Sequence, residues 1–256
     1  MPVVEREKTH DDELDVLNHL LSKREKLQNN PELILKEIDD YNSKTGKLIT
    51  IGPGKGKFLK REIKSLKPTN VFEFGTYIGY SSILIAIELV KLDNSQIEDF
   101  KIYTFEFDPI FYNISSKIVK LAGLEHIIEL NYGKVSNIIE GVVDNNKISQ
   151  IDFLFVDHWK YHYLPDLRIV ESLGLISQNS VIFADNILRP GVPDYLEYIR
   201  QSPEWKQKHN LSVPNENSER LIGRYGLIYE TTIEKAANNK GDIDGVAITK
   251  CIDNLN

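Results

Sequence analysis

Four polar residues near the middle of the chain combine the types and spacing that suit metal chemistry. Asp157 and Lys160 follow one strongly apolar run, and Asp185 and Asn186 follow the next. Two carboxylates and an amide supply oxygen ligands, which suit a hard divalent cation such as Mg²⁺ that keeps positions open for water or substrate. A single Asp at such a place more often caps a loop, but the three together favour a metal site.

Lys160 is a candidate general base because it lies three residues after Asp157. A lysine that is partly desolvated beside a cation can have a lowered pKa and accept a proton. Taken alone, a lysine is far more often a solvated surface residue. Neither of its neighbours decides the matter: His158 has no partner at metal-ligand spacing, and Trp159 could be a core aromatic as well as a lid.

A glycine turn and an acid point to a nucleoside ligand. Gly75 and Gly79 follow Glu73 in a Gly-x-x-x-Gly pattern, and Glu106 ends the next apolar run. An acid there can accept both ribose hydroxyls, whereas the Gly-x-Gly-x-x-Gly that accommodates a pyrophosphate is missing. An ordinary turn and a carboxylate at a helix N-terminus are the alternatives. Together these residues favour an adenosine ligand without a pyrophosphate, such as S-adenosylmethionine.

Strands and helices alternate along the chain. We expect strands at 71–74, 102–105, 127–130, 151–156 and 181–184, and helices at 81–90, 109–122, 135–142, 165–173 and 193–200. Five such units predict an α/β fold with a doubly wound, mostly parallel sheet and helices on both faces. Strands at 225–233 and 245–252, joined by a loop at 238–241, would add a C-terminal antiparallel hairpin. Ligands bind at the carboxyl ends of the strands in such sheets.

The N-terminal part is predicted to be helical. Apolar residues recur at helical spacing over 14–21, and Asn30-Pro31 has the cap and first-turn residues of a second helix. We interpret 51–56 as a turn before a helix through 58–66. The expected organisation is a single domain over 1–256, with a helical extension or lid at 1–66 and a core at 67–256.

Composition excludes several classes of protein. The 256 residues have a formal net charge of -7, which argues against a nucleic-acid partner, and the local basic run from Lys55 to Lys64 is interpreted as a solvated helix face. Cys251 is the only cysteine, so no intrachain disulfide can form. Without a long apolar run or a signal-like N-terminus, we expect a soluble, cytoplasmic protein with no membrane partner, either a monomer or a weak homodimer.

Three blocks resemble catechol O-methyltransferase, a cation-dependent S-adenosylmethionine O-methyltransferase family. The blocks are residues 73–81, Asp-His-Trp-Lys at 157–160 with 163–166 after it, and Ala-Asp-Asn at 184–186 with 190–194 after it. The likeness runs from about Leu14 to the C-terminus and is densest over 68–200. It implies a Rossmann-like methyltransferase sheet, S-adenosyl-L-methionine and Mg²⁺ as cofactors, and methyl transfer to a hydroxyl of a small catechol-type substrate.

The resemblance also implies a role for each matching residue. Lys160 would be the catalytic base, and the magnesium ligands would be Asp157, Asp185 and Asn186. The cofactor-binding residues would be Ile51, Gly52, Glu73, Gly75, Tyr77, Tyr80, Ser81, Glu106, Phe107, Gly133, Ser136, Asp157, His158 and Trp159. The substrate-binding residues would be Ile49, Trp159, Lys160, Asn186, Pro190 and Glu230.

Departures from the family pattern leave alternatives open. Lys47 stands where animal enzymes have an aromatic gatekeeper, which predicts a wider or more polar pocket that accepts acidic catechols, and 212–224 does not align cleanly. One alternative is a related cation-dependent enzyme that acts on caffeate-like or other vicinal-diol substrates. Another is a non-catalytic S-adenosylmethionine-binding protein on the same fold, which the intact Lys160 disfavours. A dehydrogenase is disfavoured by the missing dinucleotide motif.

Overall fold

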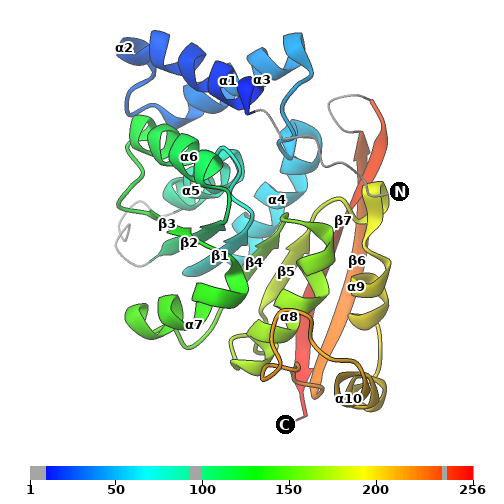
Figure 1. The fold of residues 1–256 in the computed structure, drawn as a ribbon. Coiled ribbons are helices and arrows are strands. Elements are labelled where there is room, and N and C mark those ends of the chain that lie inside the picture. The colour runs from blue at the N-terminus through cyan, green and yellow to red at the C-terminus, as the bar shows by residue number, and fades with distance from the viewer. Residues whose placement is uncertain (1–9, 93–99, 238–240, 256) are drawn as a thin grey trace, which may run out of the picture.

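Seven strands form one sheet in the order β3-β2-β1-β4-β5-β7-β6. The architecture comes from a computed structural model that describes residues 10–92, 100–237 and 241–255 (Figure 1). Strands β1 to β5 are parallel, while β7 runs antiparallel to both β5 and β6. The prediction of a mostly parallel sheet with a C-terminal antiparallel hairpin is therefore confirmed. The strands are β1 (Asn70–Phe74), β2 (Lys101–Glu106), β3 (Ile128–Tyr132), β4 (Phe153–Val156), β5 (Val181–Ala184), β6 (Leu227–Ala237) and β7 (Ile243–Asn254).

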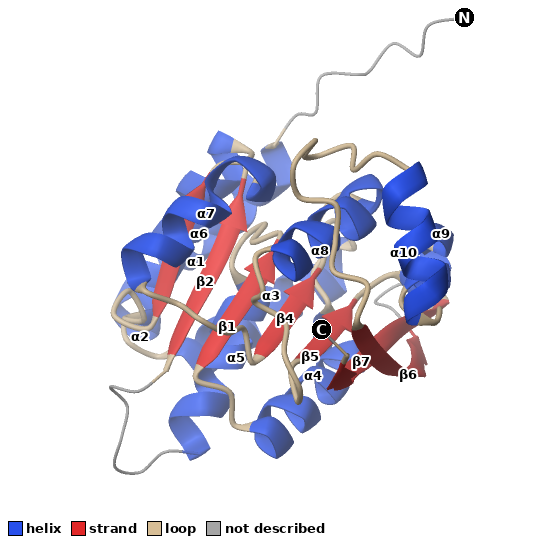
Figure 2. Cartoon of the chain, turned by 90° about the horizontal axis from the view of Figure 1, so that it is seen from below, coloured by secondary structure: helices blue, strands red, loops and turns tan. Residues whose placement is uncertain are grey.

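Helices cover both faces of the sheet, as Figure 2 shows. Because side chains alternate along a strand, Phe153 and Phe155 of β4 pack into one apolar core, and Leu154 and Val156 pack into the other. The first core is covered by α1 (Asp11–Ser22), α2 (Arg24–Leu27), α3 (Pro31–Thr45), α4 (Gly52–Leu66), α5 (Tyr80–Leu92) and α6 (Pro109–Ala122). The second is covered by α7 (Val135–Asn146), α8 (Tyr163–Ser172), α9 (Pro193–Tyr198) and α10 (Pro203–Ser212).

Local capping signals fix several helix ends where the sequence predicts them. The side chain of Asn30 accepts a hydrogen bond from the backbone N of Leu33 at 3.1 Å, which caps α3. Asp108 caps α6 in the same way, and Gly123 ends α6 with a φ of 73°, a conformation in which glycine meets no Cβ penalty. These contacts account for the correct bounds of α6.

In the connecting segments, one prediction is wrong and one helix was not predicted. Residues 52–56 are the first turn of α4 and not a separate turn. A Cβ on Gly54 would lie 2.6 Å from the backbone O of Ala237 at the end of β6, so this glycine serves close packing of a helix. Helix α10 lies in a segment with no predicted element. The predicted hairpin loop falls largely on 238–240, outside the described residues.

The sheet reverses its strand order between β1 and β4. The carboxyl ends of β1 and β4 therefore lie side by side, with β2 and β3 on one side of them and β5 on the other. Such a switch point is where open α/β sheets bind ligands. In the described parts of the chain, no helix is both long and apolar enough to cross a membrane.

Candidate functional site

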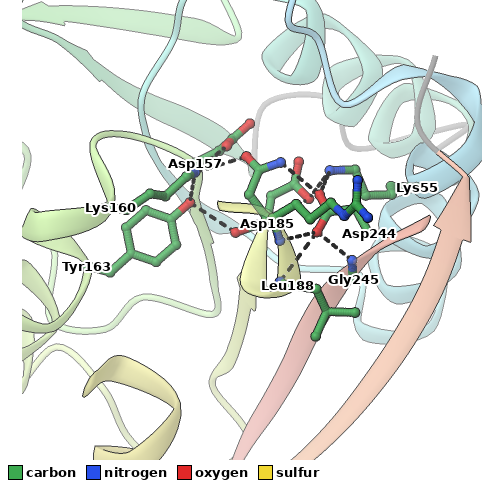
Figure 3. Close-up of polar contacts among 10 residues, drawn as sticks. Lys55, Asp157, Lys160, Tyr163, Asp185, Leu188, Asp244 and Gly245 are labelled. Carbon is green, nitrogen blue, oxygen red and sulfur yellow. Dashed lines mark hydrogen bonds and ion pairs between the residues drawn. The ribbon is translucent and has the colours of Figure 1, made fainter. Parts of the chain in front are cut away.

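The ends of β4 and β5 bring the predicted metal ligands and the predicted base together (Figure 3). Val156 pairs with Ala184 at the last position of the two strands, so Asp157 and Asp185 leave the sheet beside each other. Nζ of Lys160 lies 3.2 Å from Oδ1 of Asp157 and 2.9 Å from Oδ1 of Asn186. The predicted proximity of these four residues is thus present in the fold.

Lys160 is held by Tyr163, a residue to which the sequence analysis assigns no role. Its Nζ donates to the hydroxyl of Tyr163 at 2.5 Å, and that hydroxyl donates to the backbone O of Asp185 at 3.1 Å. Burial raises the pKa of Tyr163 well above its usual value, so the phenol stays neutral and accepts from the lysine. The lysine side chain is 21% exposed, so it is not sealed within the core.

Asp185 is a buried acid between a second carboxylate and a lysine. Burial, and then the charge of Asp157, raise the pKa of Asp185 to about 7. Lys55 opposes this shift, because its Nζ lies 2.5 Å from Oδ1 of Asp185 and 2.8 Å from Oδ2 of Asp244. The side chain of Lys55 is only 4% exposed, so its interpretation as part of a solvated basic face is wrong.

The donor set fits a divalent cation. Asp157, Asp185 and Asn186 present carboxylate and amide oxygens, the ligands that Mg²⁺ prefers. Two carboxylates close enough to raise a pKa also favour a positive charge between them. Among the residues that the structure describes, no group of three or more His, Cys, Asp or Glu side chains is arranged to hold a metal. The candidate set is of another kind, because its third donor is an amide.

Glu106 links the turn after β1 to the turn after β2 through hydrogen bonds. Its Oε2 accepts from the backbone N of Tyr77, and its Oε1 accepts from the backbone N of Asp108, each at 2.9 Å. The side chain is buried, and burial raises its pKa. The backbone N of Gly133 donates to the Glu106 carbonyl at 2.9 Å, so the end of β3 lies alongside. A fixed carboxylate between two turns is well placed to accept ribose hydroxyls.

Gly75 permits the turn after β1 to pack against the turn after β4. Its φ is +98°, and a Cβ there would lie 2.6 Å from the backbone O of Asp157 and 2.9 Å from the backbone N of His158. The glycine is therefore required by a backbone neighbour, in addition to any ligand. This close approach places the predicted cofactor turn directly beside the candidate metal ligands.

Glu73 is fully buried under the glycine turn. Its Oε2 accepts hydrogen bonds from Ser82 and Thr104, and Oε1 has no hydrogen-bond partner in the described part of the chain. Burial raises its pKa to about 7, although the hydroxyls of Ser81, Ser82 and Thr104 lower it. Glu73 is therefore a buried acid surrounded by three hydroxyl groups.

The two tyrosines of the glycine turn point away from the strand ends. The Tyr77 hydroxyl donates to Glu13 of α1 at 2.7 Å, and the Tyr80 hydroxyl donates to Asp39 of α3 at 3.1 Å. Only the backbone of Tyr77 meets Glu106. A cofactor contact through the Tyr80 side chain is therefore not supported, because that side chain is committed to α3.

His158 is oriented by residues from two other segments. Its Nε2 lies 2.8 Å from Oδ2 of Asp166, whose Oδ1 accepts from the Asn217 amide at 2.6 Å. The imidazole stacks on Tyr163 with 5.2 Å between the ring centroids. Its Nδ1 is buried and has no hydrogen-bond partner among the described residues, so it is available to a ligand.

The remaining predicted residues differ in how exposed they are to solvent. Ile49 and Trp159 are 68% and 56% exposed, and Pro190 is also exposed. Ile51 and Gly52 are buried at the start of α4, Phe107 is half-exposed after β2, and Ser136 donates to its neighbour Asn137 at 3.3 Å.

The proposed substrate contact of Glu230 is wrong. Glu230 pairs with Lys250, which pairs with Val181 at the first residue of β5, so it lies at the end of β5 opposite to Asp185. Lys47 also differs from expectation, because its Nζ lies 2.5 Å from Oδ1 of Asp12. That ion pair compensates the charge that suggested acidic substrates.

The fold is that of a Rossmann-like α/β protein, with a cluster of polar side chains at the switch point where such sheets bind ligands. The sequence model of the O-methyltransferase family matches residues 25–205. The chain therefore belongs to the O-methyltransferase family, and the prediction of a methyltransferase is confirmed.

Two similar proteins and one similar crystal structure are O-methyltransferases. The chain is 34% identical over 184 residues to "Catechol O-methyltransferase B" of Danio rerio, covering 72% of this chain and 67% of that protein. It is 30% identical over 215 residues to "Catechol O-methyltransferase" of Bos taurus, covering 84% and 75%. A crystal structure of an O-methyltransferase from Bacillus cereus in complex with SAH has a TM-score of 0.61 at 20% identity, covering 85% of this chain and 90% of that one.

Proposed function

We propose that this chain is a Mg²⁺-dependent catechol O-methyltransferase, which transfers a methyl group from S-adenosylmethionine to one hydroxyl of a catechol-type substrate. The observation that carries this proposal is the position of Lys160, whose Nζ contacts Asp157 at 3.2 Å and Asn186 at 2.9 Å. A base that touches two candidate metal ligands can reach an oxygen bound to the same cation. The relatives named catechol O-methyltransferase support the same activity.

The cofactor would lie along the carboxyl ends of β3, β2, β1 and β4. Glu106 would accept the ribose hydroxyls, since its carboxylate is already oriented by two backbone donors. Nδ1 of His158 is a buried polar atom without a hydrogen-bond partner among the described residues, which a polar ligand would satisfy. The complex of the Bacillus cereus neighbour with SAH supports a cofactor of this chemical class.

Asp157, Asp185 and Asn186 would hold the cation. Bound there, Mg²⁺ would bind both oxygens of a vicinal diol and lower the pKa of the hydroxyl that attacks. Asp185 is buried, whereas Asp157 is partly exposed and Trp159 is exposed, so a substrate would approach the cation from the side of Asp157 and Trp159. A diol entering from that side would meet the lysine amine.

Lys160 would accept the proton of the attacking hydroxyl. The charged lysine that results would be stabilised by contacts already present, to Asp157, Asn186 and the Tyr163 hydroxyl. General bases of this kind contribute typically about 10²–10⁴-fold in rate. The exposed side chains of Ile49 and Trp159 would pack against the aromatic ring and align it with the methyl donor.

Substrate class is tested by comparing catechol, phenol and a caffeate-like acid with S-adenosylmethionine and Mg²⁺, followed by mass spectrometry of the products. The proposal predicts a monomethylated catechol and a far lower kcat/KM for phenol, because one oxygen cannot occupy two metal positions. A clear preference for the acid over catechol would favour the caffeate-type alternative. Equal kcat/KM for catechol and phenol would contradict the proposal.

A further inference from the structure

A buried ion pair lies directly behind the candidate metal ligands. Asp244 stands near the start of β7 and Lys55 in the first turn of α4, and their side chains are 2% and 4% exposed. Figure 3 shows the pair beside Asp185, on the side away from Lys160. The function proposed above uses neither residue.

The Asp244 carboxylate is fully engaged. Its Oδ1 accepts from the backbone N of Gly245 at 2.7 Å, of Arg189 at 3.0 Å and of Leu188 at 3.4 Å. Its Oδ2 accepts from Lys55 Nζ at 2.8 Å and from the Asn186 amide at 2.9 Å. With five donors on two oxygens, Asp244 holds the turn that follows β5 and is not itself a ligand.

The contact between Asp244 and Asn186 fixes which way the asparagine amide points. A carboxylate only accepts hydrogen bonds, so the amide nitrogen of Asn186 must face Asp244. The amide oxygen is then turned to the other side, where Lys160 Nζ lies 2.9 Å from it. A reversed amide would place its oxygen against the carboxylate and present donors to the lysine and to a cation.

Lys55 fixes both acids with one ammonium group. On Asp185, Lys55 Nζ and the backbone N of Asn186 both contact Oδ1, at 2.5 Å and 2.7 Å, which leaves Oδ2 as the candidate ligand oxygen. On the other side, the same ammonium balances Asp244. A buried carboxylate needs such a partner to remain charged.

We propose that Asp244 and Lys55 are a positioning pair, which orients Asn186 and Asp185 for a divalent cation without contacting it. This inference rests on the proposed function, because it concerns the same cation. Outer partners of metal ligands typically change metal affinity by about 10- to 100-fold when they are removed.

The test compares Asp244→Asn and Lys55→Met with wild type, and uses Asp242→Asn as the matched control, since Asp242 forms a half-exposed ion pair with Arg189. Mn²⁺ affinity is measured by electron paramagnetic resonance, and S-adenosylmethionine affinity by calorimetry. If the pair acted through charge alone, Asp244→Asn would weaken Mn²⁺ binding and Lys55→Met would strengthen it. Positioning predicts that both variants weaken Mn²⁺ binding by about 10- to 100-fold, while cofactor affinity and the control remain as in wild type.

Four results would overturn the inference. Wild-type affinity for Mn²⁺ in Asp244→Asn, or unchanged or tighter binding in Lys55→Met, would exclude a positioning role and leave the proposed function standing. A parallel loss of cofactor binding in Asp244→Asn would show that the pair supports the fold and not the cation site. Failure of the wild-type protein itself to bind Mn²⁺ would remove the proposed function as well.

Discussion

Nζ of Lys160 lies 2.9 Å from Oδ1 of Asn186, across the ends of two neighbouring strands. The lysine comes from the 3₁₀ turn Lys160–His162 after β4, and the asparagine from the irregular turn after β5. The contact therefore depends on the pairing of β4 with β5 and on the Asp244 contact that orients the asparagine. It puts the proposed base next to a proposed ligand of the cation.

The first prediction concerns Lys160→Met, which removes the amine and keeps a long apolar side chain. We expect kcat for catechol methylation to fall by about 10²–10⁴-fold, with cofactor affinity unchanged, because Lys160 acts on the chemical step. The rate of methylated-product formation at saturating substrate gives kcat, and calorimetry gives the affinity for S-adenosylmethionine. An unchanged kcat with a raised KM would instead make Lys160 a binding residue.

The second prediction separates the two aspartates. Asp157→Ala should abolish turnover with little loss of stability, because its side chain is 20% exposed. Asp185→Ala should abolish turnover and also destabilise the protein by roughly 1–3 kcal/mol, because it removes one of two acidic partners of the buried Lys55. Chemical denaturation measures the difference between the variants. Equal stabilities would contradict the structural role given to Asp185.

The third prediction is selective loss of cofactor affinity in Glu106→Ala. Two ribose hydroxyls bonded to a charged acceptor are worth roughly 1.5–3 kcal/mol each, so the dissociation constant should rise by at least about tenfold. Calorimetry with S-adenosylmethionine checks this, with the exposed Glu125→Gln as control. Cofactor affinity equal to that of wild type would remove the ribose assignment.

The fourth prediction uses the pKa of Glu73, which burial raises from 4.5 to about 7 in the folded protein. The protonated form is favoured by folding, so its contribution to stability is complete below pH 4.5 and is lost as the pH rises through about 7. Relative to Glu73→Gln, wild type should therefore lose roughly 3 kcal/mol of unfolding free energy between about pH 5 and about pH 8. Urea denaturation at both pH values measures this, and a constant difference would show that Glu73 does not titrate there.

Sequence patterns correctly predicted those strands and helices that are determined by neighbouring residues in the chain. Buried strands are short apolar runs, and α3 and α6 carry their own caps, at Asn30 and Asp108. The start of α4 was not predicted because glycines such as Gly54 usually indicate a turn. Here the glycine is needed because the end of β6 packs closely against the helix. Helix α10 carries a cap at Ser202 and a proline at its first position, but few apolar residues, so the signal was present and weak.

The predicted proximity of the candidate site residues is present where strand register alone decides it. Asp157, Asp185 and Asn186 follow neighbouring strands, so sheet order brings them together. Lys55 and Asp244 are 189 residues apart, and no periodicity links them. One feature of the sequence could have indicated that Lys55 is buried: it stands between two glycines, and both pack closely against neighbouring residues in α4. Glu230 was misplaced because the register of the hairpin cannot be read from its sequence.

Cation dependence tests the central claim most directly. Catechol methylation should be measured with metal-stripped protein in EDTA and S-adenosylmethionine, and again after Mg²⁺ is restored in excess of the chelator. We predict no methylated product from the stripped protein and full recovery with Mg²⁺, because Asp157, Asp185 and Asn186 would then orient both catechol oxygens beside Lys160. Full activity of protein verified to be free of metal would contradict the assignment of these three residues.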